Sequence, residues 1–250
     1  MHEICDDAEL AALCDGDPIC VWAAQGFTGT SRAWTGADRR AVAVAAPALS
    51  ARDRLVLHGD PDSAARLVEA VLSEVGPAFR PLGDRALVEQ VAQQVPALTY
   101  VGSFGWMDGT AADIGPAPAS TAAWLPRTAE PEVAALLQRH YPGSYAKPGI
   151  PGVRRWAGIR DDTGALVAVG ADAWSAPTVG LVGGIAVRPA ARGRGTGRRL
   201  VGFLLSEAVR GYGRAALMVD DDNDPALRLY KSLGLRYRPV GAATAQVTPT

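Results

Sequence analysis

The chain has 250 residues, enough for one large domain or two small ones. Hydrophobic residues make up 48% of the sequence and charged residues 20%, which excludes a disordered chain and allows a sizeable core. The 25 basic and 26 acidic side chains give a net charge of -1, which argues against a generally basic surface for nucleic acid or an anionic membrane.

The three cysteines, Cys5, Cys14 and Cys20, lie near the start of the chain without a C-x-x-C pair or the histidine spacing of a zinc site. We therefore expect neither a disulfide framework nor a metal site. The first ten residues lack the basic and apolar regions of a signal peptide, and no apolar run approaches the roughly 20 residues of a membrane span. These features predict a soluble, cytoplasmic protein.

The first hundred residues show alternating strand and helix patterns. Asp60 and Pro61 are typical of a helix cap and a first helical turn, apolar residues then recur every four positions, and Gly76 is typical of a helix end. The predicted strands are 41–46, 54–58 and 98–104, and the predicted helices are 61–75 and 85–94. We interpret residues 1–107 as an α/β domain.

Residues 108–126 differ in composition from the rest of the chain, being rich in Gly, Ala, Pro, Ser and Thr without a periodic apolar pattern. This segment is interpreted as a linker between domain 1–107 and a second domain, 127–250. In the second domain Thr128 is expected to cap a helix that ends near Pro142, and Gly211 to end a later helix. The predicted strands are 156–159, 166–172, 179–187, 215–219 and 235–240, with helices from about 196 to 210 and from 225 to 233.

The most informative stretch is IAVRPAARGRGTGRRLVGFLL, residues 185–205, in which an apolar strand runs into an Arg- and Gly-rich loop that opens a helix. Gly193, Gly195 and Gly197 remove side chains, so the backbone N–H groups at the helix start can face a ligand. The helix dipole and the neighbouring arginines add positive charge, which predicts an anion site suited to pyrophosphate.

Other phosphate loops fit less well. The stretch lacks the lysine and Ser/Thr of G-x-x-x-x-G-K-[ST], and its spacing is G-x-G-x-G, not the G-x-G-x-x-G of dinucleotide sites. An ordinary strand-to-helix turn with solvated arginines remains the alternative.

Two ordered motifs in this region resemble those of the GNAT superfamily of acyl-CoA-dependent N-acyltransferases. Arg192, Gly195 and Gly197 match R-x-x-G-x-G, and Asn223 with Tyr230 belongs to a segment similar to N-x-x-A-x-x-L-Y-x-x-x-G. The resemblance covers about residues 155–240. It implies an α/β fold with a mixed sheet, GNAT-like in the C-terminal half. The N-terminal half resembles the smaller, degenerate half of glycine N-acyltransferase-like members, which would lie on the acceptor side.

The resemblance also implies a role for each matching residue. Backbone groups of Ile185, Ala186 and Val187 would pair with the pantetheine arm of acyl-CoA as an added strand. Asn223 would contact the pantetheine, with helix capping as an equal alternative, and Tyr230 would protonate the departing thiolate, with plain core packing as its alternative. The pyrophosphate would be held by Arg192, Gly193, Arg194, Gly195, Thr196, Gly197 and Arg198.

The base that would deprotonate the amine is not identified by the resemblance. The positions where some members carry a glutamate are occupied by Leu181 and Met218, neither of which accepts a proton. Asp172, the run Asp220–Asp222 and His140 are candidates, each with a structural role as the alternative, and an ordered water is a further possibility.

The resemblance thus implies transfer of an acetyl or other short acyl group from acyl-CoA to a primary amine of a small molecule or amino acid. No metal, nucleic acid or membrane partner is expected, and a homodimer is compatible with the sequence. A non-catalytic acyl-CoA sensor and an interaction protein that reuses the fold are the alternatives.

Overall fold

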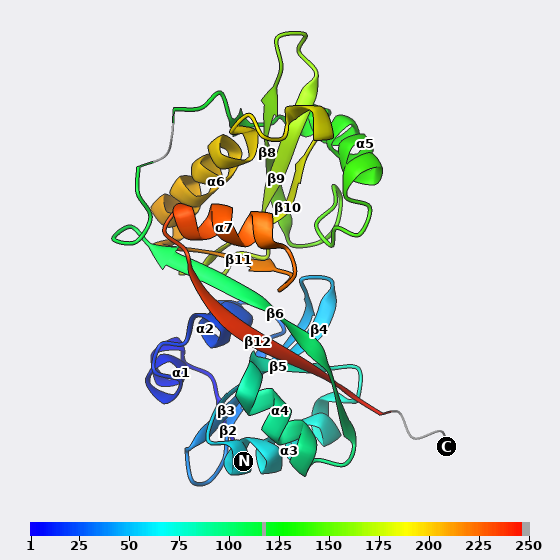
Figure 1. Ribbon diagram of the computed structural model, residues 1–250. Helices are drawn as coiled ribbons and strands as arrows, with labels where there is room; N and C mark the ends of the chain where they lie inside the picture. The colour runs from blue at the N-terminus through cyan, green and yellow to red at the C-terminus, as the bar shows by residue number, and fades with distance from the viewer. Residues whose placement is uncertain (117–118, 247–250) are drawn as a thin grey trace. The chain divides into compact units, whose positions relative to one another are not determined.

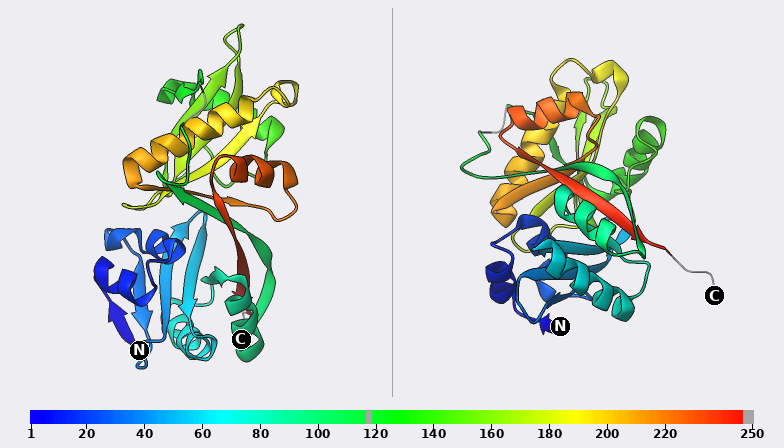
Figure 2. Two further views of the ribbon diagram at one scale, coloured as in Figure 1. Left: turned by 60° about the vertical axis from the view of Figure 1, so that its left-hand side comes forward. Right: turned by 60° about the horizontal axis from the view of Figure 1, so that its bottom comes forward.

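The computed structural model describes residues 1–116 and 119–246 (Figure 1, with two further views in Figure 2). The chain forms two compact units. The first consists of Met1–Trp106 together with the C-terminal segment from Arg238 onward, and the second consists of Met107–Tyr237. Within the described ranges, no helix combines the length and the apolar character needed to cross a membrane.

The first unit is a mixed sheet with helices packed on it. Strands β1 to β4 pair antiparallel in sequence order, β4 pairs parallel with β5, and β12 pairs antiparallel with β5. Its elements are β1 (His2–Ile4), α1 (Asp7–Leu13), α2 (Pro18–Ala24), η1 (Gln25–Phe27), β2 (Arg32–Thr35), β3 (Ala41–Leu49), β4 (Arg52–Gly59), α3 (Pro61–Val75), β5 (Arg80–Asp84), α4 (Arg85–Gln94) and the start of β6 (Leu98–Thr110).

Local capping signals define the helices of this unit. The Asp60 side chain accepts a hydrogen bond from the Ser63 amide, Pro61 occupies the first turn of α3 and Gly76 ends it. Apolar residues on one face of α3 and α4 then pack against β3 and β4. The predicted helices 61–75 and 85–94 are confirmed at both ends.

The second unit has the sheet order β6-β11-β10-β9-β8-β7, and α6 contributes Leu200, Leu204 and Ala208 to its core. Strands β8, β9 and β10 form an antiparallel meander, and β11 is parallel to β10. Its further elements are β7 (Ala123–Trp124), η2 (Arg127–Ala129), α5 (Glu130–His140), β8 (Val153–Arg160), β9 (Leu166–Ala173), β10 (Gly180–Val187), η3 (Pro189–Ala191), α6 (Thr196–Tyr212), β11 (Arg214–Val219), α7 (Asp224–Ser232) and the start of β12 (Arg236–Ala245).

The two halves of the chain repeat one order of elements. The order β2-β3-β4-α3-β5-α4-β6 of the first half recurs as β8-β9-β10-α6-β11-α7-β12 in the second. The last strand of each half, however, passes into the other unit. Val240 of β12 pairs with Asp84 of β5, and Asp108 of β6 forms an ion pair with Arg214 of β11. Each half therefore completes the sheet of the other unit.

This exchange corrects the predicted domain limits. Residues from Arg238 onward belong to the first unit and not to a domain 127–250, because β12 provides the hydrogen-bonding partner of β5. The predicted linker 108–126 is also partly ordered structure. Trp124 pairs with Ala157 of β8, and its Nε1 donates a hydrogen bond to Glu207 at 2.7 Å. Residues 117 and 118 of that segment lie outside the described residues.

Two predicted helix ends in the second unit are wrong. Thr128 lies inside η2, and Ala129 is the residue that precedes α5. Gly211 lies within α6, which continues to Tyr212 and ends at Gly213, whose φ of 83° is left-handed. Two glycines near one helix end made the choice ambiguous in the sequence.

Candidate functional site

The two parallel strands β10 and β11 separate near the middle of β10. Their ladder pairs Gly180–Val182 with 215–217, whereas β10 continues to Val187. On its other side β10 remains paired with β9 through a bulge between Gly183 and Ala186. Residues 183–187 therefore present one backbone edge beyond the ladder with β11, where an extended ligand arm can pair as an added strand.

Glycine is required in this bulge by a close approach of neighbouring groups. Gly184 has a φ of 61°, and a Cβ there would lie 2.7 Å from Cη2 of Trp156 and 3.2 Å from Cβ of Ala146. Ala146 belongs to the 141–152 loop between α5 and β8, so this loop and Trp156 lie against the bulge. The sequence analysis did not assign the loop to the site; the Gly183-Gly184 pair inside a strand was the available signal.

The residues predicted to bind pantetheine lie along this edge. Ile185 and Val187 are half-buried and Ala186 is buried, and the two latter residues pair with β9. The structure thus brings all three to the end of β10, directly before the loop predicted to bind pyrophosphate. That their backbone groups pair with pantetheine stays a prediction.

Helix α6 begins without a side-chain cap from the described part of the chain. Its N-cap is Gly195, with φ 75° and ψ 3°, and Gly193 has φ 71°, so both occupy left-handed conformations that favour glycine. The first amides of the helix, from Thr196 onward, lack intrahelical acceptors as in any helix. An anion placed there would meet these amides and the positive end of a long helix dipole.

Arginine side chains form hydrogen bonds within and around this loop. Nε of Arg192 donates to the carbonyl of Val187 at 3.1 Å, and Nη1 of Arg199 donates to the carbonyl of Arg194 at 3.1 Å. Nη1 of Arg198 donates to Oγ of Ser232 in α7 at 2.7 Å. Two of these guanidinium groups therefore bind backbone carbonyls of β10 and the loop, and the third binds a side chain of α7. The Arg194 side chain is exposed.

Tyr230 lies in α7 with only 7% of its surface exposed. It packs in the core cluster of the second unit, which includes Leu200 of α6 and Leu217 of β11. Burial raises the pKa of its hydroxyl, and the nearby hydroxyl of Tyr141 raises it further. Tyr230 is therefore a neutral hydrogen-bond donor at any physiological pH, and the core role and the donor role are compatible.

Asn223 caps α7. Its Oδ1 accepts a hydrogen bond from the Ala226 amide at 3.3 Å, which supports the capping alternative. We expect Asn223→Ala to lower the free energy of unfolding by about 1 kcal/mol, and Asn223→Asp to leave it nearly unchanged because aspartate caps equally well. Urea unfolding of the three proteins tests this; equal stability of the alanine variant would contradict a capping role.

The positions of the expected glutamate and the base candidates differ in their surroundings. At the glutamate positions Leu181 is buried and Met218 is half-buried, and both are apolar. Asp172 is 5% exposed and is committed to other groups: Ser175 Oγ donates to it at 2.6 Å, Tyr212 Oη at 2.8 Å and Arg155 Nε at 3.3 Å. This network joins β8, β9 and α6 and gives Asp172 a structural role.

His140 and the acidic run 220–222 lie at the ends of α5 and β11. Oδ1 of Asp221 accepts a hydrogen bond from Tyr237 at 2.6 Å. Burial raises the pKa of Tyr141, and the charge of Asp220 raises it further. Asp220 therefore lies near Tyr141, whose hydroxyl in turn raises the pKa of Tyr230.

The role of Asp172 can be tested directly. We expect Asp172→Asn to lower the free energy of unfolding by about 2 kcal/mol, because it removes the charge that three donors share. Any turnover of the folded variant should remain within about threefold of the wild type. A stable variant with turnover reduced by about 100-fold would instead identify Asp172 as the base.

The chain is similar to known proteins in sequence and in fold. Residues 129–235 match the model of the Acetyltransferase (GNAT) family. A stretch of 68 residues is 48% identical to an uncharacterized protein of Mycobacterium leprae. The match covers 24% of this chain and 18% of that protein's length. The chain thus spans only a small part of that relative.

Two solved structures share the fold over most of the chain. The GCN5-related N-acetyltransferase from Sphaerobacter thermophilus is 16% identical, with a TM-score of 0.64 over 97% of this chain and 92% of that chain. The GCN5-related N-acetyltransferase from Kribbella flavida is 19% identical, with a TM-score of 0.58 over 86% of this chain and 89% of that chain. Residues 129–235 are thus similar in sequence to the Acetyltransferase (GNAT) family, and most of the chain shares its fold with these two structures.

Proposed function

We propose that the protein transfers an acetyl or other short acyl group from acyl-CoA to a primary amine of a small molecule or amino acid. The observation that carries the proposal is the separation of β10 from β11 next to the uncapped start of α6. Acyl-CoA has an extended pantetheine arm attached to a diphosphate. The arm would need the free edge of β10, and the diphosphate would need the start of α6 next to it. Residues 188–195, which include Gly193 and Gly195, connect them.

In the proposed reaction the amine attacks the thioester carbonyl directly. The tetrahedral oxyanion would accept a hydrogen bond from a backbone N–H of β10, beyond its ladder with β11. The C–S bond then breaks, and CoA leaves as a thiolate that takes up a proton from water. We assign to the phenol of Tyr230 a hydrogen bond to that sulfur, and the proton lost by the amine would leave through water toward Asp220.

The pKa of Tyr230 limits what this residue contributes. With an ordinary tyrosine pKa of about 10 and a thiol pKa of about 8.5, full proton transfer is uphill by about 2 kcal/mol. Burial of Tyr230 raises its pKa and therefore makes complete transfer less favourable still. We infer that Tyr230 stabilises the leaving sulfur as a hydrogen-bond donor.

The proposal is tested first by calorimetry with acetyl-CoA and then by acyl transfer. A panel of amino acids and small primary amines is incubated with the protein and acetyl-CoA, and mass spectrometry searches for products heavier by one acetyl group. Binding together with a product supports the proposal. Absence of acetyl-CoA binding would favour an interaction protein that reuses the fold.

A second candidate function is a non-catalytic acyl-CoA sensor. It is favoured by the apolar residues Leu181 and Met218 and by the commitment of Asp172 to its three donors. A sensor would bind acetyl-CoA without releasing free CoA. Binding would change the affinity of the protein for another molecule or its assembly with that molecule. Measured CoA release in the presence of the amine panel separates the two candidates.

A further inference from the structure

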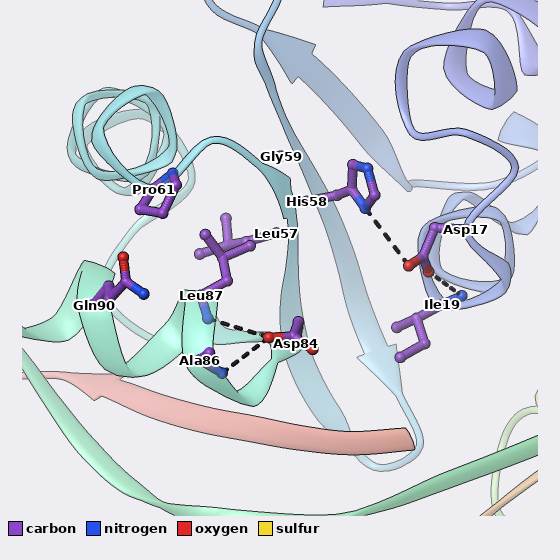
Figure 3. Close-up of a pocket in the computed structure, with 11 residues that line it drawn as sticks. Asp17, Ile19, Leu57, His58, Gly59, Pro61, Asp84, Ala86, Leu87 and Gln90 are labelled. Carbon is purple, nitrogen blue, oxygen red and sulfur yellow. Dashed lines mark hydrogen bonds and ion pairs between the residues drawn. The ribbon is translucent and has the colours of Figure 1, made fainter. Parts of the chain in front are cut away.

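The first unit contains a pocket of about 380 Å³ that the acyl transfer does not use (Figure 3). It lies where β4 and β5 end and where α3 and α4 begin, and the first turn of α2 adds one wall. In the repeated order of elements these are the counterparts of β10, β11, α6 and α7. The pocket therefore occupies the position that the proposed acyl-CoA site occupies in the second unit.

This position in the first unit is not built for acyl-CoA. The ladder between β4 and β5 reaches Leu57 and Gly83, close to the end of each strand, so the strands do not separate as β10 and β11 do. The start of α3 is also occupied. Oδ1 of Asp60 accepts a hydrogen bond from the Ser63 amide at 3.1 Å, which places a carboxylate where a diphosphate would bind.

The pocket is likewise unsuited to other anions. Asp17 caps α2 by accepting from the Ile19 amide at 2.7 Å, and Asp84 caps α4 by accepting from the Ala86 amide at 2.9 Å. The helix starts that surround the pocket thus already carry carboxylates. An anionic ligand would have to displace them and would meet their negative charge.

The two carboxylates that line the pocket differ in their partners. Asp17 forms ion pairs with Arg238 and with His58, whose Nδ1 lies 3.5 Å away, and Figure 3 shows the His58 ring turned toward it. These partners lower the pKa of Asp17, while the hydrogen bond to Asp17 raises that of His58. Asp84 is exposed and, within the described ranges, pairs with no cation; the adjacent Arg85 pairs with Glu89 at 3.3 Å.

The remaining lining combines apolar surface with one amide. Ile19, Leu57 and Leu87 are buried side chains that line the pocket, and Gln90 projects from α4 one turn after Leu87. An apolar wall with a few polar groups in a cavity of this size is typical of a small-molecule site. We propose that this pocket binds a small organic ammonium compound, its cationic nitrogen paired with Asp84 and its aliphatic body against the apolar wall.

Three probes of matched shape test the proposal: 3-methylbutylamine, 3-methylbutanol and 3-methylbutanoate. Their binding to the full chain is measured by ligand-observed NMR at about pH 8, where an alkylamine is charged. We expect saturable binding of the amine and at least about tenfold weaker binding of the alcohol and the carboxylate.

Two variants place the amine in this pocket. Asp84→Asn retains a good helix cap but removes the charge, and we expect it to weaken amine binding about tenfold or more. Ala86→Phe fills the pocket from an exposed position and should abolish binding. Glu69→Gln removes an exposed charge on α3 outside the lining and serves as the control, with unchanged affinity.

The proposal is overturned if the amine does not bind or if the carboxylate binds as tightly. It is also overturned if Asp84→Asn and Ala86→Phe both retain wild-type affinity, which would assign the amine to the acceptor side of the acyl-transfer site. The inference does not depend on the proposed acyl transfer, because binding is measured without acyl-CoA.

Discussion

The Gly195→Asp variant is expected to bind acetyl-CoA about 100-fold more weakly than the wild type, or worse. Gly195 has a φ of 75°, which an L-residue adopts with strain. The new carboxylate would also accept hydrogen bonds from the first amides of α6 and would repel the diphosphate. A 100-fold loss corresponds to about 2.7 kcal/mol, a reasonable sum for these effects. Isothermal titration calorimetry measures it.

The matched control is Gly211→Asp, which makes the same chemical change in the last turn of α6. Gly211 has open space around it, so the control should fold and bind acetyl-CoA within about threefold of wild type. Adding Arg192→Ala to Gly195→Asp should remove the brace to Val187 and weaken binding further. Unchanged affinity of this double variant would refute the assignment of the loop to the diphosphate.

Tyr230→Phe is expected to lower kcat for acyl transfer by about 10- to 100-fold, with acetyl-CoA affinity unchanged. The phenol is proposed to act only when charge develops on the departing sulfur, so its loss affects turnover and not donor binding. The raised pKa of Tyr230 keeps the phenol protonated. The wild-type rate should therefore show no alkaline loss from this residue up to about pH 10.

Thermal unfolding of the same variant separates catalysis from packing. Tyr230 is buried, so phenylalanine fills nearly the same volume, and stability should change by less than about 1 kcal/mol. Tyr100→Phe, in the first unit, is the control and should retain wild-type kcat. If Tyr230→Phe retains the wild-type kcat, Tyr230 has only a packing role in the core. If the wild type and Tyr230→Phe both bind acetyl-CoA without turnover, the sensor is favoured.

Features that depend on neighbouring residues could be predicted from the sequence. The caps at Asp60 and Gly76, the strand ending at Val187 and the loop with Gly193 and Gly195 all follow from local backbone preferences. For the same reason the sequence located the proposed diphosphate loop. The predicted helix 85–94 was confirmed because its cap lies next to it.

Features that depend on distant residues could not be predicted. The pairing of Val240 with Asp84 and of Trp124 with Ala157 joins segments far apart in the chain, and composition made residues 108–126 look like a linker. The commitment of Asp172 to Tyr212 depends on the packing of α6 onto β9. Short elements such as β1, α1 and β2 were missed because their few residues carry little periodicity.

The passage of β6 and β12 between the two units has a consequence for any attempt to divide the protein. A gene fragment ending at residue 107 would lack the strand that hydrogen-bonds to β5, and the complementary fragment would lack the one beside β11. Each fragment would expose an open sheet edge, which promotes aggregation. Co-expression of both fragments should restore a soluble complex, because each fragment supplies the strand that the other lacks.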